Sequence, residues 1–212
     1  MGVKITKSEY LDSKAKRLFD IIVASSLLLV SAPVCVPVAT GLLIFQRPVL
    51  FRHERVARGG GFFYCLKFRT MHLDAEKVLK ELIEKNPESK EHWLKFRKLP
   101  ADPRITRVGK LLRKSSIDEL PQLLNVLKGD MSIVGPRPIT QEELANYGVD
   151  VRVYVEQKPG LTGVWQVSGR SCVGYSERVA MDKEYYSSAT FLYDCMLLLK
   201  TPIVVLLQKG AH

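Results

Sequence analysis

The chain has 212 residues, of which 46% are hydrophobic and 25% charged, so it is long enough for one domain with a substantial core and a small appendage. Its 32 lysines and arginines outnumber its 22 aspartates and glutamates and give a net charge of +10, which points to polyanionic partners: nucleic acid, anionic lipid or phosphorylated metabolites. Neither a zinc site nor a disulfide framework is indicated, and a reducing compartment is the simplest interpretation. The four cysteines lack C-x-x-C spacing: Cys35, Cys65, Cys172 and Cys195.

An uncharged run of 25 residues, 21–45, follows a polar and basic N-terminal segment. As a straight helix it would extend about 37 Å, enough to cross a hydrocarbon core of about 30 Å. The run is longer than the apolar region of a signal peptide, and no small-residue cleavage site follows it. Pro33 and Pro37 fall in its middle, where each removes a helical hydrogen bond, so we expect a bend there.

Basic residues crowd both ends of this run. Because positive charge favours the cytoplasmic side, a hairpin with both ends in the cytoplasm satisfies the pattern better than a spanning helix does. Two arms of ~12 residues would reach about 18 Å each. The sequence therefore predicts a re-entrant helix-break-helix, with a buried core helix of a soluble protein as the weaker alternative. The flanking cations are Lys4, Lys7, Lys14, Lys16 and Arg17 before the run, and Arg47, Arg52, Arg55 and Arg58 after it.

Two strand-like runs, 49–52 and 62–68, come next and predict a small β-hairpin. They are separated by a glycine-rich turn at 58–61. Three glycines beside basic residues fit a plain hairpin turn better than a phosphate-binding loop. Strand alternation places Lys67 and Arg69 on one side of the second run.

Residues 74–99 have the pattern of helices interrupted at Pro87, with an apolar stripe and i, i+4 pairs of glutamate and lysine, and we interpret them as scaffold. A basic amphipathic helix follows, which can lie on an anionic membrane surface at headgroup level. A solvated charged face is the alternative, but the apolar run upstream favours lipid contact. A cation recurs at every third residue of this helix: Arg104, Arg107, Lys110 and Arg113.

The central stretch, 115–138, reads SSIDELPQLLNVLKGDMSIVGPRP. Proline is tolerated only in the first turn of a helix, so Pro121 predicts that regular helix begins near Asp118. Gly129 is its expected stop. The apolar residues have the spacing of one buried helix face: Leu120, Leu123, Leu124 and Leu127.

Asp118 and Glu119 would then lie at a helix N-terminus, where free N–H groups and the macrodipole favour ionised acids and bound anions. The same residues also fit a structural role, because Ser116 to Glu119 matches the S-x-x-E capping box and Asp118 alone would make a good N-cap. The stretch closes with Arg137 between two prolines. Two adjacent carboxylates followed by a constrained arginine suggest chemistry on phosphate.

Toward the C-terminus, 164–167 predicts a short strand with a turn on each side. Arg170, in the second turn, is a candidate phosphate or uridine contact, although a lone loop arginine is more often a surface ion pair. Asp182 lies in a helix-like segment. The final run, 191–207, predicts an interfacial or core helix and not a second span, because it is broken by Asp194, Lys200 and Pro202.

Four blocks of this sequence resemble one family: LKFRTM at 66–71, DPRITRVGKLLRK at 102–114, the central stretch at 115–138 and PGLTGVWQVSGR at 159–170. They are similar, in the same order, to the bacterial polyprenyl-phosphate sugar-1-phosphate transferases, the monotopic phosphoglycosyl transferases that begin exopolysaccharide and O-antigen synthesis. The likeness runs from about Lys16 to the last helix. It implies a re-entrant membrane helix, although the family's Ser-Pro at the bend is Ala32-Pro33 here.

The patterns and the resemblance together predict a mostly α fold with a small β-hairpin. Residues 1–46 would form an N-terminal segment and re-entrant membrane hairpin, and 47–212 a compact cytoplasmic catalytic domain with interfacial amphipathic helices. The resemblance implies a UDP-sugar donor, an undecaprenyl phosphate acceptor, release of UMP, Mg²⁺ as cofactor, and a position among lipid on the cytoplasmic face of the bacterial inner membrane. The sequence carries no nucleic-acid-binding motif, and the oligomeric state is open.

Carried over residue by residue, the resemblance implies that Asp118 attacks the donor's β-phosphorus, holds the phosphosugar as an aspartyl intermediate and contacts the metal. Glu119 would support the metal or the substrate. Arg137 and Arg113 would offset phosphate charge. The remaining candidates for binding substrate or phosphate are Lys67, Arg69, Arg170 and Asp182.

Galactose 1-phosphate and glucose 1-phosphate are the favoured groups for transfer, because the 74–101 segment and the WQVSGRS block look like those of family members that transfer them. Cys172 and Ala189-Thr190 depart from the family pattern and weaken any choice of sugar. The alternative function is a non-catalytic, membrane-tethered basic module that binds anionic lipid or nucleic acid. It would explain the net charge but not the adjacent Asp118 and Glu119. A phosphatase that forms an aspartyl phosphate is a third possibility.

Overall fold

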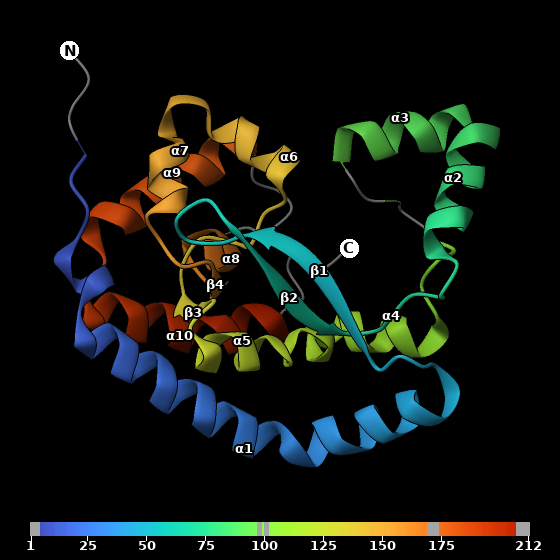
Figure 1. Cartoon of the computed structure of the whole chain (residues 1–212), viewed down its shortest axis with the longest axis horizontal. Helices are drawn as coiled ribbons and strands as arrows, with labels where there is room; N and C mark the ends of the chain where they lie inside the picture. Colours follow the sequence, from blue (N-terminus) through green and yellow to red (C-terminus); the bar gives the residue numbers. More distant parts are fainter. Residues whose placement is uncertain (1–4, 97–98, 100–101, 169–173, 207–212) are drawn as a thin grey trace.

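The structure of the chain, a computed structural model, describes residues 5–96, 99, 102–168 and 174–206. It is mostly helical with two small sheets, and the long N-terminal helix lies along one side of the molecule (Figure 1). The described elements, in chain order, are η1 (Glu9–Asp12), α1 (Lys14–Phe45), β1 (Leu50–Val56), β2 (Phe62–Phe68), α2 (Ala75–Lys85), α3 (Pro87–Phe96), α4 (Arg107–Lys114), η2 (Ile117–Glu119), α5 (Gln122–Lys128), β3 (Ser132–Val134), α6 (Gln141–Leu144), η3 (Ala145–Asp150), α7 (Val151–Val155), β4 (Gly160–Thr162), α8 (Val164–Ser168), α9 (Tyr175–Ser188) and α10 (Phe191–Leu206).

Helix α1 is one continuous helix that runs through Pro33 and Pro37 and curves in the middle (Figure 1). The predicted break into two helices is therefore not seen. Each proline removes only one helical hydrogen bond, and the hydroxyls of Ser31 and Thr40 bond main-chain carbonyls of the preceding turn. By length and composition α1 is apolar enough to cross a membrane. Its most apolar 18-residue stretch has a mean hydropathy of 2.3, and 6% of that stretch is buried. Its re-entrant path stays a prediction.

The first turns of α1 pack into the main hydrophobic core through Phe19. Lys16 forms a buried ion pair with Asp194 of α10, with 2.5 Å between the ammonium nitrogen and a carboxylate oxygen. Asp20 accepts hydrogen bonds from the hydroxyl of Ser132 and from the next main-chain amide of β3. These contacts join the start of α1 to both β3 and α10. The division into a membrane segment and a catalytic domain stays a prediction.

Strands β1 and β2 form the predicted antiparallel hairpin, with Val56 paired to Phe62. β1 continues beyond the four residues predicted, because its alternation of side chains lets Val56 enter the core, where it is fully buried. Gly59 and Gly60 make the turn with φ angles of 87° and 83°, a region that glycine adopts without strain. The glycine-rich segment is thus a hairpin turn, as predicted.

Helices α2 and α3 confirm the predicted helices and their interruption near Pro87. The basic helix α4 is shorter than predicted, because Arg104 lies outside it. The Arg104 guanidinium pairs with Asp102, at 2.6 Å, and lies over the ring of Trp93. Arg104 therefore adds nothing to the cationic stripe of α4, and contact of this helix with lipid stays a prediction.

The second sheet is a parallel pair formed by β3 and β4. The predicted strand at 164–167 is wrong, because these residues begin α8 and the strand lies just before them. Gly163 accounts for the difference: its carbonyl accepts a hydrogen bond from the amide of Val167 and so starts a helical turn. The last helix, α10, buries Asp194 and Leu197 while much of its opposite side is exposed.

Candidate active site

A cavity of about 50 Å³ lies where the β-hairpin, η2, the loop after β3 and the start of β4 meet. Its wall brings together side chains that are far apart in the sequence. Its polar and charged residues are Arg55 and Lys67 of the hairpin, Glu119 of η2, Gln122 of α5, Arg137 after β3 and Gln166 of α8. Three of the predicted site residues, Lys67, Glu119 and Arg137, thus face one space.

The turn that carries the two acids differs from the prediction. η2 is a short 3₁₀ turn, and regular helix begins only at Gln122. Pro121, immediately before α5, has no N–H to donate, which separates the turn from the helix. Ser116 has a left-handed φ of 57° and its side chain makes no capping hydrogen bond. The capping-box interpretation of Ser116 to Glu119 is therefore wrong.

Asp118 does not line the cavity but directly precedes the lining residue Glu119 in the chain, and it is 7% exposed. Burial, and next the charge of Glu119, raise the pKa of Asp118 to about 6. The cations of Lys67 and Arg113 oppose this rise. The carboxyl group is therefore mostly ionised at neutral pH, in surroundings that penalise its charge.

Two cations lie near the acids, one on the β-hairpin and one on α4. Lys67 pairs with Glu119, at 2.6 Å between the ammonium nitrogen and a carboxylate oxygen. Arg113, on the last turn of α4, donates from Nε to the hydroxyl of Thr70 at 2.8 Å. Burial lowers the pKa of Arg113, and the charge of Asp118 is the largest opposing cause. The pair of acids thus lies between the β-hairpin and α4.

Arg137 projects from the loop after β3 and lies over the indole ring of Trp165, at 5.2 Å from the ring centre. The loop is held by an unusually close approach of two main chains. A β-carbon on Gly160 would lie 2.1 Å from the amide nitrogen of Gly135, so only glycine fits there. This approach fixes the main chain two residues before Arg137.

Sequence reasoning missed two further arginines. Arg55 of β1 lines the cavity and pairs with Glu143, at 3.2 Å. Arg178 of α9 lies over the same indole as Arg137, at 4.1 Å from the ring centre. Signals for both existed: alternation along a longer β1 puts Arg55 on the face of Lys67, and Arg178 precedes Asp182 by one helical turn.

The surroundings of the cavity carry more positive than negative charge. Burial, and next the charge of Arg55, lower the pKa of His53 to about 4, so this ring stays neutral at pH 7. Burial also lowers the pKa of Arg178, and the charge of Arg137 is the next cause. Among the described residues, Nε of Arg178 and the indole nitrogen of Trp165 are buried without a hydrogen-bond partner. Such an array suits a ligand with several negative charges.

Besides Asp118 and Arg113, two further predicted site residues lie outside the cavity wall. Arg69 donates to the carbonyl of Pro48 at 2.9 Å and lies over the ring of Phe51, at the base of the hairpin. Asp182 is buried in a second core cluster, where it accepts a hydrogen bond from the hydroxyl of Tyr147 at 2.6 Å. Burial raises the pKa of Asp182 to about 7. Arg170 lies outside the described residues.

The carboxylates present suit magnesium only in combination with a substrate. In the part of the chain that the structure describes, no group of three or more His, Cys, Asp or Glu side chains is placed to hold a metal. Mg²⁺ is commonly bound by one or two carboxylates plus substrate phosphates, however, and Asp118 and Glu119 supply such a pair. The three described cysteines, Cys35, Cys65 and Cys195, are free, as predicted, and Cys172 lies outside the described residues.

Comparison with known proteins shows relatives across most of the chain. It is 47% identical, over 197 residues, to an undecaprenyl-phosphate galactose phosphotransferase of Salmonella typhimurium, covering 93% of this chain and 41% of that protein. It is 44% identical to the exopolysaccharide production protein ExoY of Sinorhizobium fredii, covering 93% of this chain and 88% of that one. A UDP-glucose:undecaprenyl-phosphate glucose-1-phosphate transferase of Caulobacter vibrioides is 35% identical, and the match covers 93% of this chain and 72% of that protein. The chain thus spans less than half of the Salmonella protein.

The family model described as bacterial sugar transferase matches residues 11–208. The match includes the end of η1, all of the long helix, both sheets and every residue of the cavity wall. The cation-lined cavity and the buried acid beside it therefore lie within the matched region, and the chain belongs to the bacterial sugar transferase family.

Proposed function

We propose that this protein transfers a hexose 1-phosphate from a UDP-sugar to undecaprenyl phosphate and releases UMP. The observation that carries the proposal is the buried Asp118, whose pKa lies near 6, beside a cavity lined by Arg55, Lys67 and Arg137. A carboxylate nucleophile needs cations near it to approach a phosphorus atom shielded by negative oxygens. The names of the Salmonella and Caulobacter relatives support the same reaction class.

In the first step a carboxylate oxygen of Asp118 forms a bond to the β-phosphorus of the donor. The bond from that phosphorus to the bridging oxygen breaks, and UMP leaves with the electron pair. The product is an aspartyl phosphosugar. The raised pKa favours this role, because a more basic carboxylate is the better nucleophile so long as it remains ionised.

Arginine and lysine side chains offset the charge that develops on the phosphate oxygens. Arg137 and Arg55, which both line the cavity, would bind the diphosphate, and Lys67 forms an ion pair with Glu119 beside them. Asp118 and Glu119 would also hold Mg²⁺, which would offset phosphate charge further. Arg113 completes the positive surroundings of Asp118 from the α4 side.

In the second step an oxygen of undecaprenyl phosphate bonds to the same phosphorus, and the bond to Asp118 breaks to restore the carboxylate. Splitting the reaction lets one small site receive a soluble donor and a lipid acceptor in turn. The bond between C1 of the sugar and its oxygen never breaks, so the anomeric configuration is retained. A position on the cytoplasmic face of the bacterial inner membrane, with α1 in the lipid, is part of the proposal.

Galactose and glucose are the sugars we favour, because the relatives' names include both. The test is UMP release from UDP-galactose, UDP-glucose and UDP-N-acetylglucosamine by detergent-solubilised protein with Mg²⁺, with and without undecaprenyl phosphate. Asp118→Asn is the key variant. Asp74→Asn is the matched control, since Asp74 is exposed and its side chain makes no capping hydrogen bond at the start of α2.

Lipid-dependent UMP release from one donor, lost in Asp118→Asn and kept in Asp74→Asn, supports the proposal and identifies the sugar. Free sugar phosphate released without lipid would instead indicate the phosphatase. Absence of UMP from every donor, together with salt-sensitive binding to polyanions, would overturn the proposal in favour of the non-catalytic basic module.

A further inference from the structure

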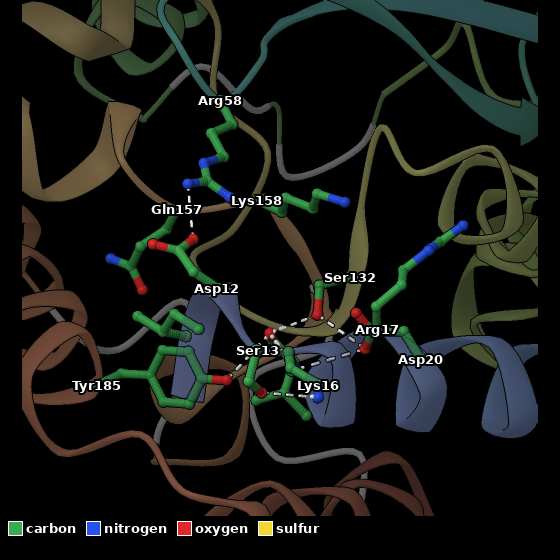
Figure 2. A pocket seen from close by; sticks show the side chains of 12 residues that line it. Asp12, Ser13, Lys16, Arg17, Asp20, Arg58, Ser132, Gln157, Lys158 and Tyr185 are labelled. Carbon is green, nitrogen blue, oxygen red and sulfur yellow. Dashed lines mark hydrogen bonds and ion pairs between the residues drawn. The ribbon is translucent and has the colours of Figure 1, made fainter. Parts of the chain in front are cut away.

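A second cavity, of about 110 Å³, lies at the start of α1 and shares no lining residue with the candidate active site. Figure 2 shows it between η1 and α1 on one side and the hairpin turn, β3 and residues 157–158 on the other. Its volume is several times the roughly 10–15 Å³ that a single water needs. The cavity therefore has room for a small polar group.

Besides Lys16, which is paired with Asp20 and Asp194, three cations from separate segments line this cavity. They are Arg17 of α1, Arg58 of the hairpin turn and Lys158 of the loop before β4. Figure 2 shows the side chain of Lys158 extending between the other two. Burial lowers the pKa of the Lys158 ammonium, and the positive charge of Arg17 is the next cause. The three charges thus repel one another across a partly buried space.

The acids that line the cavity are already paired with other groups. Asp12 pairs with Arg58, at 2.6 Å, and with Lys7, at 2.7 Å. Asp20 pairs with Lys16, at 3.4 Å, and its carboxylate also accepts hydrogen bonds from β3. Neither carboxylate forms an ion pair with Lys158.

Arg17 and Lys158 differ in what balances their charge. Arg17 donates to the carbonyls of Val126 and Leu127 at the end of α5, at 2.6 Å and 2.7 Å, and so meets the negative end of that helix. The Lys158 ammonium has no hydrogen-bond or ion-pair partner among the described residues. An ammonium that is half-buried and unpaired favours an incoming anion.

Gly129 leaves open the space between these two cations. Nη2 of Arg17 and Nζ of Lys158 each lie 3.7 Å from the point that a β-carbon on Gly129 would occupy. Gly129 ends α5 with a φ of 94°, a conformation that excludes most side chains. One oxygen-rich anion at this point would therefore be within reach of both nitrogens.

We propose that this cavity binds a phosphate group, held mainly by Lys158 and Arg17, with Arg58 at its rim. Phosphate presents several acceptor oxygens in a tetrahedron, which matches donors that arrive from three different segments. The group can belong to an anionic lipid headgroup or to a soluble phosphate. The lipid source has a structural basis, because the exposed apolar residues of α1 begin with Leu18, directly after Arg17.

The test measures binding and not turnover. All proteins carry Arg137→Ala, so that phosphate binding at the candidate active site contributes little. Into this background we place Lys158→Gln, the charge-preserving Lys158→Arg, and Lys80→Gln as the matched control, because Lys80 is exposed on α2. One arm titrates sodium phosphate at constant ionic strength and records the melting temperature. The other measures flotation with phosphatidylcholine vesicles that contain none or 30% phosphatidylglycerol.

We expect Lys158→Gln to weaken phosphate binding about tenfold or binding to the anionic vesicles about fivefold, with Lys158→Arg and Lys80→Gln close to the parent. Weaker binding of sodium phosphate by Lys158→Gln identifies the ligand as a soluble phosphate. Weaker binding of this variant to the anionic vesicles identifies it as a lipid headgroup. Equal behaviour of Lys158→Gln and Lys80→Gln in both arms would overturn the proposal. If Lys158→Gln fails to fold, Arg58→Gln replaces it, with a smaller expected loss and the same contradicting outcome.

Discussion

Among single residues, Asp118 shows most clearly how the fold prepares a functional group at a cost in stability. A carboxyl group that is 7% exposed and has a pKa of about 6 destabilises the folded protein whenever it is ionised. Asp182 is buried more deeply but accepts a hydrogen bond from Tyr147. The charges of Glu119, Lys67 and Arg113 act on the Asp118 carboxylate in the candidate site, where Asp182 has the neutral hydroxyl of Tyr147.

Asp118→Asn is therefore expected to stabilise the protein while removing its activity. The folded carboxyl group keeps its proton up to about pH 6, whereas the unfolded one releases it near pH 4, so the free energy of unfolding of the wild type falls as pH rises through this window. Above about pH 6, the free energy of unfolding of Asp118→Asn should exceed that of the wild type by roughly 1–3 kcal/mol, since one pKa unit is about 1.4 kcal/mol. Urea unfolding at pH 5 and pH 8 checks this. A stability difference that is no larger at pH 8 than at pH 5 would contradict the burial argument.

Arg55 and Arg69 provide a matched comparison within the hairpin. Arg55 lines the cavity, whereas Arg69 binds the carbonyl of Pro48 at the hairpin base. We expect Arg55→Gln to lower kcat/KM roughly tenfold to a hundredfold, because hydrogen bonds between charged groups contribute about 1.5–3 kcal/mol. Arg69→Gln should change it less than threefold. Steady-state UMP release measures both, and a larger effect at Arg69 would show that the hairpin base contacts the donor.

At the scale of elements, the predictable parts are those with one strong local cause. The hairpin followed from strand patterning and its glycine turn, and α2 and α3 from helical periodicity and Pro87. The strand and helix near 160–168 were misplaced. Their boundary depends on the close approach of Gly160 to Gly135, which lies 25 residues earlier in the chain, and local patterns do not report such a contact. The two acids were found by motif, but the 3₁₀ turn that carries them was not, since it depends on packing between α4 and the hairpin.

The contact between Gly135 and Gly160 makes a prediction about the second sheet. Gly160→Ala places a β-carbon 2.1 Å from the amide nitrogen of Gly135, so the strands must separate. We expect a loss of about 1–3 kcal/mol in the free energy of unfolding and reduced donor binding, because Arg137 follows β3. Urea unfolding measures the first effect. Gly61→Ala is the control, since its β-carbon would meet nothing within 4 Å; equal losses in the two variants would refute the close-approach argument.

At the scale of the whole molecule, α1 and α10 each expose several apolar side chains, and the two helices meet near their N-terminal ends, where Phe19 packs against Phe191. α1 exposes Leu29 and Val30, at 78% and 76%, and α10 exposes Leu192 and Leu199. Large exposed apolar surfaces of this kind mark contact with lipid or with another protein. Arg17 directly precedes Leu18, the first large exposed apolar residue of α1.

Leu192→Glu should therefore weaken binding to phosphatidylcholine vesicles without changing the melting temperature by more than about 2 °C, because Leu192 is 77% exposed and makes little core contact. Val149→Glu is the control, since Val149 is 99% exposed on η3, away from α1 and α10. Vesicle flotation and thermal unfolding of both variants provide the test. Equal flotation of the two variants would show that α10 does not contribute to lipid binding.

The ion pair between Lys16 and Asp194 has a consequence for when the core can close during synthesis of the chain. Lys16 lies in the first turn of α1, but its buried partner Asp194 lies on α10, 178 residues later in the chain. The Asp194 carboxylate also accepts hydrogen bonds from the hydroxyls of Tyr10 and Tyr185. Until α10 is synthesised, α1 lacks the carboxylate that balances its buried ammonium. This part of the core can therefore close only after α10 has been made.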